Sequence, residues 1–269
     1  MTLRVLAVDW SGALVGAEKK IWLAEVIGGR LQRLQCGRGR EAFSEHLIEE
    51  AARDPNMIVG LDFAFSMPAW FLRERGLTSA PALWEHVARD GNAWLARCEV
   101  PFWGRTGRSK PSGLEMFRRA ELETHRVSGI GVKSVFQIGG AGAVGTGSLR
   151  GMPLLLRLQD AGFGIWPFSG NGLPRVVEIY PRLLTGAVNK SKRETREQYL
   201  ITHCPDFSAV KRDVAASSED AFDAAVSALR MWEHRDELLS LRVTDDPLTA
   251  LEGAIWQPKT LSPAESVPL

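Results

Sequence analysis

Acidic residues stand at positions where the surrounding sequence predicts burial, and they are the residues of this chain best suited to chemistry. Three apolar runs each carry one acid near the carboxyl end, namely Asp9, Asp62 and Glu178. An ionised carboxylate in an apolar setting is costly, so such a group shifts its pKa or acquires a cation as partner. Several carboxylates at one place predict a divalent-cation site, because Mg²⁺ and Mn²⁺ favour oxygen ligands.

A second pair of acids lies in EDAFDAAVSAL (219–229), which reads as the start of a helix. Asp220 and Asp223 share one face of this helix, outside its apolar stripe. That stripe consists of Phe222, Ala225, Val226, Leu229 and Trp232. Acids in the first helical turn are stabilised by the macrodipole, and Ser217 or Ser218 is a suitable N-cap. Capping and a solvated face would explain both acids, and a metal site shared with the strand acids is the alternative.

Each strand acid also has a structural interpretation. Asp9 precedes a Ser-Gly pair and could form a turn, and Asp62 could accept hydrogen bonds inside the core. Glu178 could form a buried ion pair with Arg175 or Arg182. Acids are rarely buried without a partner, so three of them together favour the metal-site interpretation.

Hydrophobic patterning predicts the elements that would position these acids. The run LRVLAVDW (3–10) is almost continuously apolar and predicts a strand buried on both faces. The Gly28-Gly29 pair between two apolar segments predicts a hairpin, so the chain opens with three antiparallel strands. A helix over 41–53 precedes a buried strand at 57–65, and this crossover makes the new strand parallel to the first.

The segment RVVEIYP (175–181) predicts one more buried strand, and KSKRETREQYLI (190–201) predicts a charged amphipathic helix. The expected fold is therefore α/β, with a mixed five-stranded sheet of three antiparallel strands and then two parallel ones, flanked by helices. The carboxyl ends of parallel strands lie side by side, and ligands bind in the crevice just outside them. The strand acids are expected to meet there.

Residues 1–269 are expected to form a single domain with a large insertion over 68–173. In this segment the strand pattern stops, and loops rich in glycine and proline separate helical stretches. The helical stretches are predicted near 69–76, 80–98, 113–125 and 149–161.

Composition limits the classes of protein to which the chain can belong. A formal net charge of +1 gives no overall attraction to nucleic acid or membranes, so a polyanion would need a local basic patch. The longest uncharged stretch, 134–149, holds five glycines and is shorter than the ~20 residues of a membrane helix. Three widely spaced cysteines indicate free thiols, and no secretory pattern is visible. We therefore expect a cytoplasmic protein without a membrane partner.

The segment FWGRTGRSKPSGLEMFRR (102–119) has five basic residues and one acidic residue, a local charge of +4. The candidate nucleic-acid-binding residues are Arg105, Arg108, Lys110, Arg118, Arg119 and Trp103. Basic groups beside aromatic platforms are what single-stranded nucleic acid requires. A solvated charged surface is the alternative, here and in the second basic run at 189–197.

A glycine-rich stretch, GGAGAVGTGSLRG (139–151), could bring backbone N–H groups close to a phosphate. It lacks the lysine of a P-loop and fits no motif of fixed spacing. A flexible lid and a purely structural loop are the alternatives.

Four segments in order, VLAVDWSG, VGLDFAFSMP, VVEIYP and EDAFDAAVSAL, resemble the motifs of an uncharacterised family of predicted nucleases with the ribonuclease-H-like fold. The stretch 131–158 also resembles the central glycine-rich segment of that family. More distantly, an aspartate on the first strand and an aspartate pair on a late helix are similar to the Holliday-junction resolvases, which have a four-carboxylate site. The resemblance covers most of the chain.

The resemblance implies hydrolysis of phosphodiester bonds in DNA or RNA, with Mg²⁺ or Mn²⁺ as cofactor. Asp9 would bridge two metal ions, and Asp62 and Asp223 would each hold one. Either Asp220 or Glu178 would complete the ligand shell. In such a site two ions activate a water molecule and neutralise the leaving oxygen.

Lys133 is the candidate for a further cation near the scissile phosphate, and an ordinary solvated lysine is the alternative. A nucleotide-dependent phosphotransferase or ATPase of the actin and sugar-kinase type is the main rival function, because DWSG (9–12) also resembles the first phosphate loop of that group. Such proteins carry the core twice, whereas this sequence has one copy of the strand pattern. A non-catalytic binding module on the same fold is a further alternative.

The classical catalytic motifs are missing, since the histidines are scattered and neither G-x-S-x-G nor H-E-x-x-H occurs. This argues against hydrolase triads and zinc sites. The pattern carries no signal for a particular oligomeric state.

Overall fold

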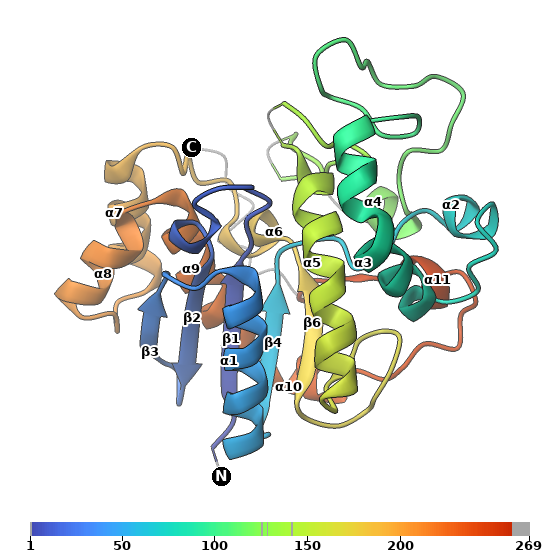
Figure 1. Ribbon diagram of the computed structural model, residues 1–269. Helices are drawn as coiled ribbons and strands as arrows, with labels where there is room; N and C mark the ends of the chain where they lie inside the picture. The colour runs from blue at the N-terminus through green and yellow to red at the C-terminus, as the bar shows by residue number, and fades with distance from the viewer. Residues whose placement is uncertain (1, 125, 128, 141, 260–269) are drawn as a thin grey trace.

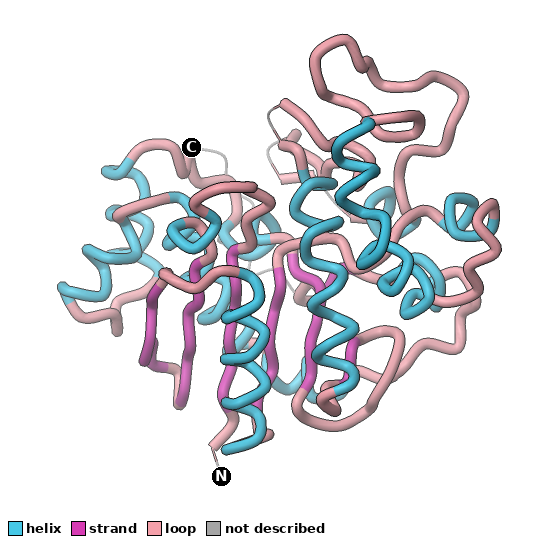
Figure 2. Tube along the Cα trace, viewed as in Figure 1, coloured by secondary structure: helices cyan, strands magenta, loops and turns pink. Residues whose placement is uncertain are grey.

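The computed structural model describes residues 2–124, 126–127, 129–140 and 142–259. A mixed seven-stranded β-sheet runs through the molecule, with helices on both faces (Figures 1 and 2). Its strands are β1 (Arg4–Asp9), β2 (Trp22–Ile27), β3 (Arg30–Gln35), β4 (Met57–Leu61), β5 (Gly164–Ile165), β6 (Arg175–Ile179) and β7 (Ile255–Trp256). The predicted α/β class is confirmed.

The strand order is β3-β2-β1-β4-β6-β5, and β7 also pairs with β6. Strands β1, β2 and β3 are antiparallel, and β4 and β6 follow in parallel to β1, as the sequence predicts. The predicted count of five strands is wrong, because the two-residue strands β5 and β7 pair with consecutive parts of β6. Strands of two residues are too short to show hydrophobic alternation.

Helices cover both faces of the sheet. Along the chain they are η1 (Ala17–Lys19), α1 (Arg40–Arg53), α2 (Ala69–Arg73), α3 (Ala80–Arg97), α4 (Arg119–Glu123), α5 (Val144–Asp160), α6 (Pro181–Thr185), α7 (Arg193–His203), α8 (Ala209–Ala216), α9 (Glu219–Glu233), α10 (Arg235–Ser240) and α11 (Thr249–Glu252). Helices α1 and α5 lie in front of the sheet in Figure 1, and α3 packs on α5. Helix α9 packs on β1 and β2 from the other face, and α6 and α8 pack on α9.

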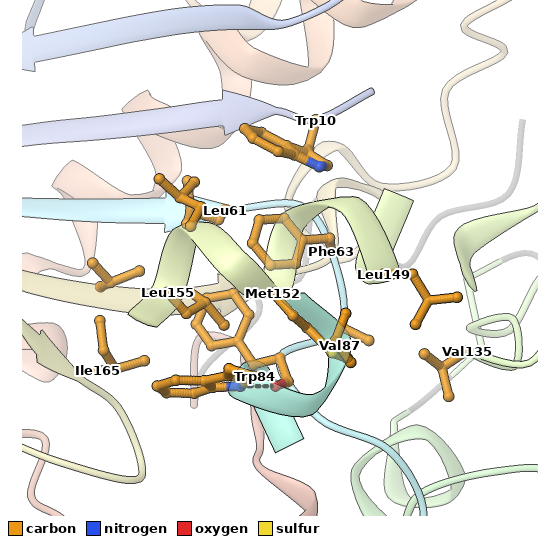
Figure 3. Close-up of a cluster of buried hydrophobic side chains, with 14 of the residues drawn as sticks. Trp10, Leu61, Phe63, Trp84, Val87, Val135, Leu149, Met152, Leu155 and Ile165 are labelled. Carbon is orange, nitrogen blue, oxygen red and sulfur yellow. Dashed lines mark hydrogen bonds between the residues drawn. The ribbon is translucent and has the colours of Figure 1, made fainter. Parts of the chain in front are cut away.

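Alternation along β1 separates two cores. Leu6 and Val8 face the α5 side, where the core includes Trp84, and Val5 and Ala7 face α9. Figure 3 shows the α5 side, in which the indole N–H of Trp84 donates a 2.7 Å hydrogen bond to the carbonyl of Phe65. Burial on both faces explains why the strand sequences are continuously apolar.

The segment 68–173 packs directly on the sheet, because its helices α3 and α5 share one core with β1 and β4. Helix α4 is only five residues long, where the pattern predicts a helix over 113–125. Helix α5 begins at Val144 instead of near 149, so Gly145 and Gly147 lie inside its first turns. Glycine is a poor helix former, which hid this start from sequence reasoning.

Helix α9 begins as predicted, with Ser218 as N-cap; its side chain accepts a 3.0 Å hydrogen bond from the Ala221 N–H. The predicted stripe faces the sheet, with Phe222 and Val226 fully buried. Small alanines elsewhere on the helix let nearly its whole circumference pack. Of the two alternatives for this pair of acids, a solvated face does not hold for Asp223, because this residue is only 8% exposed.

A buried charge network ties α1 to the sheet. Arg4 and Arg33 donate to the two Glu25 oxygens at 2.7 and 2.6 Å, and both arginines also donate to Glu50. Burial opposes ionisation of Glu50, but the two guanidinium groups outweigh it and lower the Glu50 pKa to about 2. Glu25 and Glu50 thus have cations from the protein itself. In the described part of the chain, no helix is both long enough and apolar enough to cross a bilayer.

Candidate active site

Asp9 and Asp62 lie side by side at the carboxyl edge of the sheet. In the parallel pairing of β1 and β4, Val8 is opposite Leu61, so the acid that follows each of them stands at the same level. The Asp62 N–H continues this ladder by donating a 3.1 Å hydrogen bond to the Val8 carbonyl. The predicted meeting of these two acids therefore results directly from strand register.

Both acids belong to the rows of side chains that face α9. Asp9 follows Ala7 in its row, and Asp62 follows Gly60. Gly60 shows how closely α9 approaches, because a Cβ atom there would lie 2.5 Å from the Met231 sulfur of α9. A side chain at this position would have to displace the end of Met231, and the edge beyond it lies under the amino-terminal half of α9.

Helix α9 contributes the third acid, Asp223, one turn inside its amino terminus. The carboxylate forms an ion pair with Lys190 through Oδ2. Its other oxygen, Oδ1, is buried and has no hydrogen-bond partner among the described residues. A buried carboxylate oxygen without a partner is costly, so this atom is poised to accept a further ligand.

Lys190 lies in the loop between α6 and α7, which the buried Arg196 fixes in place. The Arg196 guanidinium donates to the Lys190 carbonyl and, at 3.1 and 2.8 Å, to the Ala216 carbonyl at the end of α8. The Lys190 side chain is itself only 12% exposed. Sequence reasoning placed Lys190 in the second basic run, with a polyanion contact and a solvated surface as alternatives, and missed its contact with Asp223.

The four aspartates repel one another. The pKa of Asp62 is raised to about 8. Burial is the largest cause, the negative charges of Asp223, Glu178 and Asp220 add to it, and the positive charge of Lys190 opposes it. Burial likewise raises the Asp9 pKa well above its ordinary value, and the charges of Asp62, Asp223 and Asp220 add to this effect. Neither the Asp9 nor the Asp62 carboxylate has a hydrogen bond or ion pair with any described residue.

The helix acids are less destabilised. Burial raises the pKa of Asp223, and Lys190 counteracts it by charge and hydrogen bonding. Burial also raises the pKa of Asp220, which is half-buried, while the exposed Lys20 lowers it. Asp220 therefore lies at the rim of the cluster formed by Asp9, Asp62 and Asp223, which we call the aspartate cluster.

Tyr180 is a neighbour that sequence reasoning missed. It follows β6 directly, at the same edge of the sheet as Asp62. Burial raises the pKa of its hydroxyl, and the charges of Asp62 and Asp223 raise it further. The signal was its position, since ligands bind in the crevice outside the carboxyl ends of parallel strands and Tyr180 follows β6 directly.

Glu178 faces the other side of the sheet. Its register partner is Leu61, which belongs to the α5 core, whereas the aspartates face α9. Both Glu178 oxygens are occupied: Arg118 donates to them at 2.5 and 2.9 Å, and the Phe65 N–H donates at 2.8 Å. The structural alternative for Glu178 was a buried ion pair, and its cation is Arg118 instead of Arg175 or Arg182.

Arg118 is fully buried, so its predicted contact with nucleic acid is wrong. Besides Glu178 it contacts Glu121 through Nε at 3.0 Å, which leaves it no access to solvent. Burial lowers the Arg118 pKa, but the two glutamates outweigh this and raise it above its ordinary value. Arg119 is half-exposed and forms an ion pair with Asp246.

The rest of the predicted basic patch is exposed. Arg105, Arg108 and Lys110 lie on the surface, with the Lys110 ammonium 5.2 Å from the centroid of the Phe117 ring. Trp103 is half-buried and packs against the α5 core. Three of the six predicted residues therefore remain free to meet a polyanion.

The glycine-rich stretch packs against the loop that follows Asp9. A Cβ atom on Gly12 would lie 2.5 Å from the Gly147 nitrogen in α5, and the Trp10 indole N–H donates a 3.1 Å hydrogen bond to the Gly147 carbonyl. This close approach accounts for the glycine at position 12. Lys133 is exposed, with its stem against Gly142, and it makes no ion pair with the aspartates in the described structure.

The donor set suits a hard divalent cation, although the side chains do not yet converge on one point. Across the residues that the structure describes, no three His, Cys, Asp or Glu side chains are arranged to hold an ion as they stand. The oxygens of Asp9 and Asp62 and the free Oδ1 of Asp223 are nevertheless the chemistry that Mg²⁺ and Mn²⁺ prefer. Lys190 supplies the cation at Asp223.

Comparison with known proteins identifies no similar protein. No protein-family model matches the chain, and neither the curated proteins nor the solved structures include a significant match.

Proposed function

We propose that this chain is a metal-dependent nuclease with a ribonuclease-H-like fold, which hydrolyses phosphodiester bonds at the aspartate cluster. The observation that carries the proposal is that Asp9, Asp62 and Asp223 stand at one edge of the sheet, close enough to raise one another's pKa, without enough positive charge from the protein. Two of these carboxylates have no partner at all among the described residues, and the third has a buried free oxygen. Divalent cations would remove this repulsion.

The fold proposal is supported by the order of the long strands. Three antiparallel strands followed by β4 and β6, with the aspartates on β1 and just after β4, agree with what the resemblance implies. The rival phosphotransferase would need a second copy of the sheet. The described residues form one sheet, which favours the nuclease.

Asp9, Asp62 and Asp223 would supply the metal ligands, and Asp220 could reach the same site from the rim. The bound ions would act as Lewis acids on the phosphodiester and lower the pKa of a water molecule. In their absence the positive charge of Lys190 opposes the effect of burial, which still leaves the Asp223 pKa raised. Tyr180 remains protonated because its pKa is raised, so its hydroxyl can donate a hydrogen bond to a phosphate oxygen.

A cleavage assay tests the proposal. Labelled single-stranded and duplex DNA and RNA oligonucleotides are incubated with the protein in Mn²⁺, Mg²⁺ or EDTA. We expect cleavage of at least one substrate with a divalent cation and none in EDTA. Asp9→Asn should abolish cleavage, because it removes a charged ligand with little change in shape.

The matched control is Asp206→Asn. Asp206 is an exposed aspartate between α7 and α8, and it has no ion pair in the described structure. It should cleave like the wild type. Equal cleavage by wild type and Asp9→Asn, or cleavage that persists in EDTA, would remove the assigned role of the cluster.

A further inference from the structure

A groove lies between α1, α3 and α5, beside the loop that follows Asp9. Its volume is about 680 Å³, a size typical of sites for small organic ligands. The apolar part of its lining includes Val87, Leu149 and Leu154, and its basic residues are Arg40, Arg150 and Arg157. Leu14 and Arg157 on its lining are exposed, so the groove opens to solvent.

Two of these arginines hold the loop in place. Arg40 donates from Nε and Nη2 to the Ser11 carbonyl at 3.2 and 2.8 Å, and Nη2 also donates to the Ala13 carbonyl. Arg150 donates from Nη1 to the Gly12 carbonyl. Backbone carbonyls orient both guanidinium groups but do not neutralise their charge.

Neither Arg40 nor Arg150 has a carboxylate partner in the described structure. The Nη1 of Arg40 and the Nε and Nη2 of Arg150 donate no hydrogen bond to described residues. Glu41 also lines the groove, but it is exposed and pairs with neither arginine. This contrasts with the buried Arg118, which has two glutamates.

The guanidinium groups of Arg40 and Arg150 are close enough for their positive charges to disfavour each other. Burial lowers the pKa of Arg40, and the charge of Arg150 lowers it further. Burial also lowers the pKa of Arg150, and here the second cause is Arg105 from the exposed basic segment. Arg150 thus repels both Arg40 and Arg105, which come from distant parts of the chain, and an anion would relieve that repulsion.

The loop that Arg40 and Arg150 hold is close to Asp9 along the chain. Ser11 is two residues beyond Asp9, and consecutive Cα atoms are 3.8 Å apart, so the two Cα atoms are separated by at most roughly 7.6 Å. The groove lies on the α5 side of the sheet and the aspartates on the α9 side, so a strand held by Arg40 or Arg150 would reach Asp9 by passing over the carboxyl edge of the sheet.

We propose that the groove of Arg40 and Arg150 binds the phosphate backbone of a single nucleic-acid strand and, with Arg105, leads that strand to the aspartate cluster. The direction toward the cluster rests on the proposed function, whereas the binding of the strand does not. Arginine is suited to this role because its planar fork can bind phosphate through two donors.

The test measures the affinity for a nucleic-acid strand in EDTA, where we expect no cleavage. Fluorescence anisotropy with a labelled 12-nucleotide DNA or RNA strand in EDTA gives the affinity at several salt concentrations. For single strands each phosphate contact contributes about 0.7 to the slope of log K against log[salt]. The double variant Arg40→Met/Arg150→Met should lower the slope by about 1.4, and at 0.1 M salt bind roughly 25-fold more weakly.

Two controls separate charge from fold. Arg212→Met removes a half-buried arginine of α8, on the other face of the sheet, and should leave affinity and slope unchanged. Arg40→Lys/Arg150→Lys keeps the charges and should keep most of the slope, even if the loop is less stable in thermal melts. Asp9→Asn should bind at least as tightly as the wild type, because it removes a negative charge.

No binding of either strand by the wild type, or an unchanged slope in the methionine double variant, would overturn the inference. These results would leave the proposed nuclease intact, since Mn²⁺ binding and cleavage are measured separately. Loss of cleavage in Asp9→Asn together with an unaltered strand affinity would support both proposals.

Discussion

Replacing Asp62 with asparagine should stabilise the protein at alkaline pH when no divalent cation is present. The folded protein holds the Asp62 proton up to a pH of about 8, whereas an ordinary aspartate loses it near 3.8. Between these values the folded state binds more protons than the unfolded state, so the free energy of unfolding falls as pH rises. Asparagine has nearly the same shape and no charge, and it removes this loss.

The size of the effect can be bounded. One pKa unit corresponds to about 1.4 kcal/mol, so the interval from 3.8 to about 8 sets an upper limit of about 6 kcal/mol. Asp62 is half-buried, and water and the Lys190 charge screen part of the repulsion. We expect Asp62→Asn to stabilise the protein by about 2 kcal/mol at pH 8.5 and by close to zero at pH 4.5.

Urea denaturation in EDTA at both pH values measures this difference. The difference in unfolding free energy between Asp62→Asn and wild type is the quantity to compare. Burial lowers the His46 pKa, so this histidine makes both proteins more stable as pH rises over part of the range, and the difference cancels its contribution. Asp206→Asn serves as control and should change neither value. A variant less stable than wild type at pH 8.5 would show that the Asp62 carboxylate is satisfied in the folded protein, contrary to our reasoning.

Three further substitutions test separate contacts. Lys190→Met leaves Asp223 without its cation and should lower the free energy of unfolding in EDTA by about 3 kcal/mol. Mn²⁺ should then raise the melting temperature of this variant more than that of the wild type, and equal shifts would contradict the expectation. Arg118→Met leaves Glu178 buried without a cation and should cost about 3–5 kcal/mol in urea denaturation, yet the salt slope of strand binding should not change. Gly12→Ala places a methyl group against the backbone of α5 and should cost about 1–3 kcal/mol, and a stability equal to wild type would mean that the loop is not tightly packed.

Much of the fold could be predicted because the long strands have a clear sequence pattern. Apolar runs ending in an acid predicted β1, β4 and β6, and the helix between the hairpin and β4 predicted their parallel order. Register then brought Asp9 and Asp62 together, as expected. The start of α9 at Glu219 followed from its N-cap serine.

The side of the sheet that each acid faces could not be predicted. A strand buried on both faces is apolar at every position, so alternation gives no sign of which row faces α9. Glu178 looked equivalent to Asp62 for this reason, and only the pairing with Leu61 shows that it belongs to the α5 side. Its partner Arg118 was hidden in a basic run that looked like a solvated surface.

Long-range pairing also explains the other omissions. Lys190 and Asp223 are far apart in the sequence, and nothing local marks the lysine as a buried partner. The arginines of the groove come from α1 and α5, and α5 begins among glycines that predict a loop. Contacts of this kind depend on tertiary packing, which overrides local propensity.

The most direct test of the central claim is a crystal soaked in Mn²⁺ and measured at a wavelength where manganese scatters anomalously. We expect anomalous density within about 2.0–2.4 Å of oxygens of Asp9, Asp62 and Asp223, with Lys190 moved away from Asp223. Crystals that bind no manganese at the aspartates, with Lys190 still paired to Asp223, would contradict it.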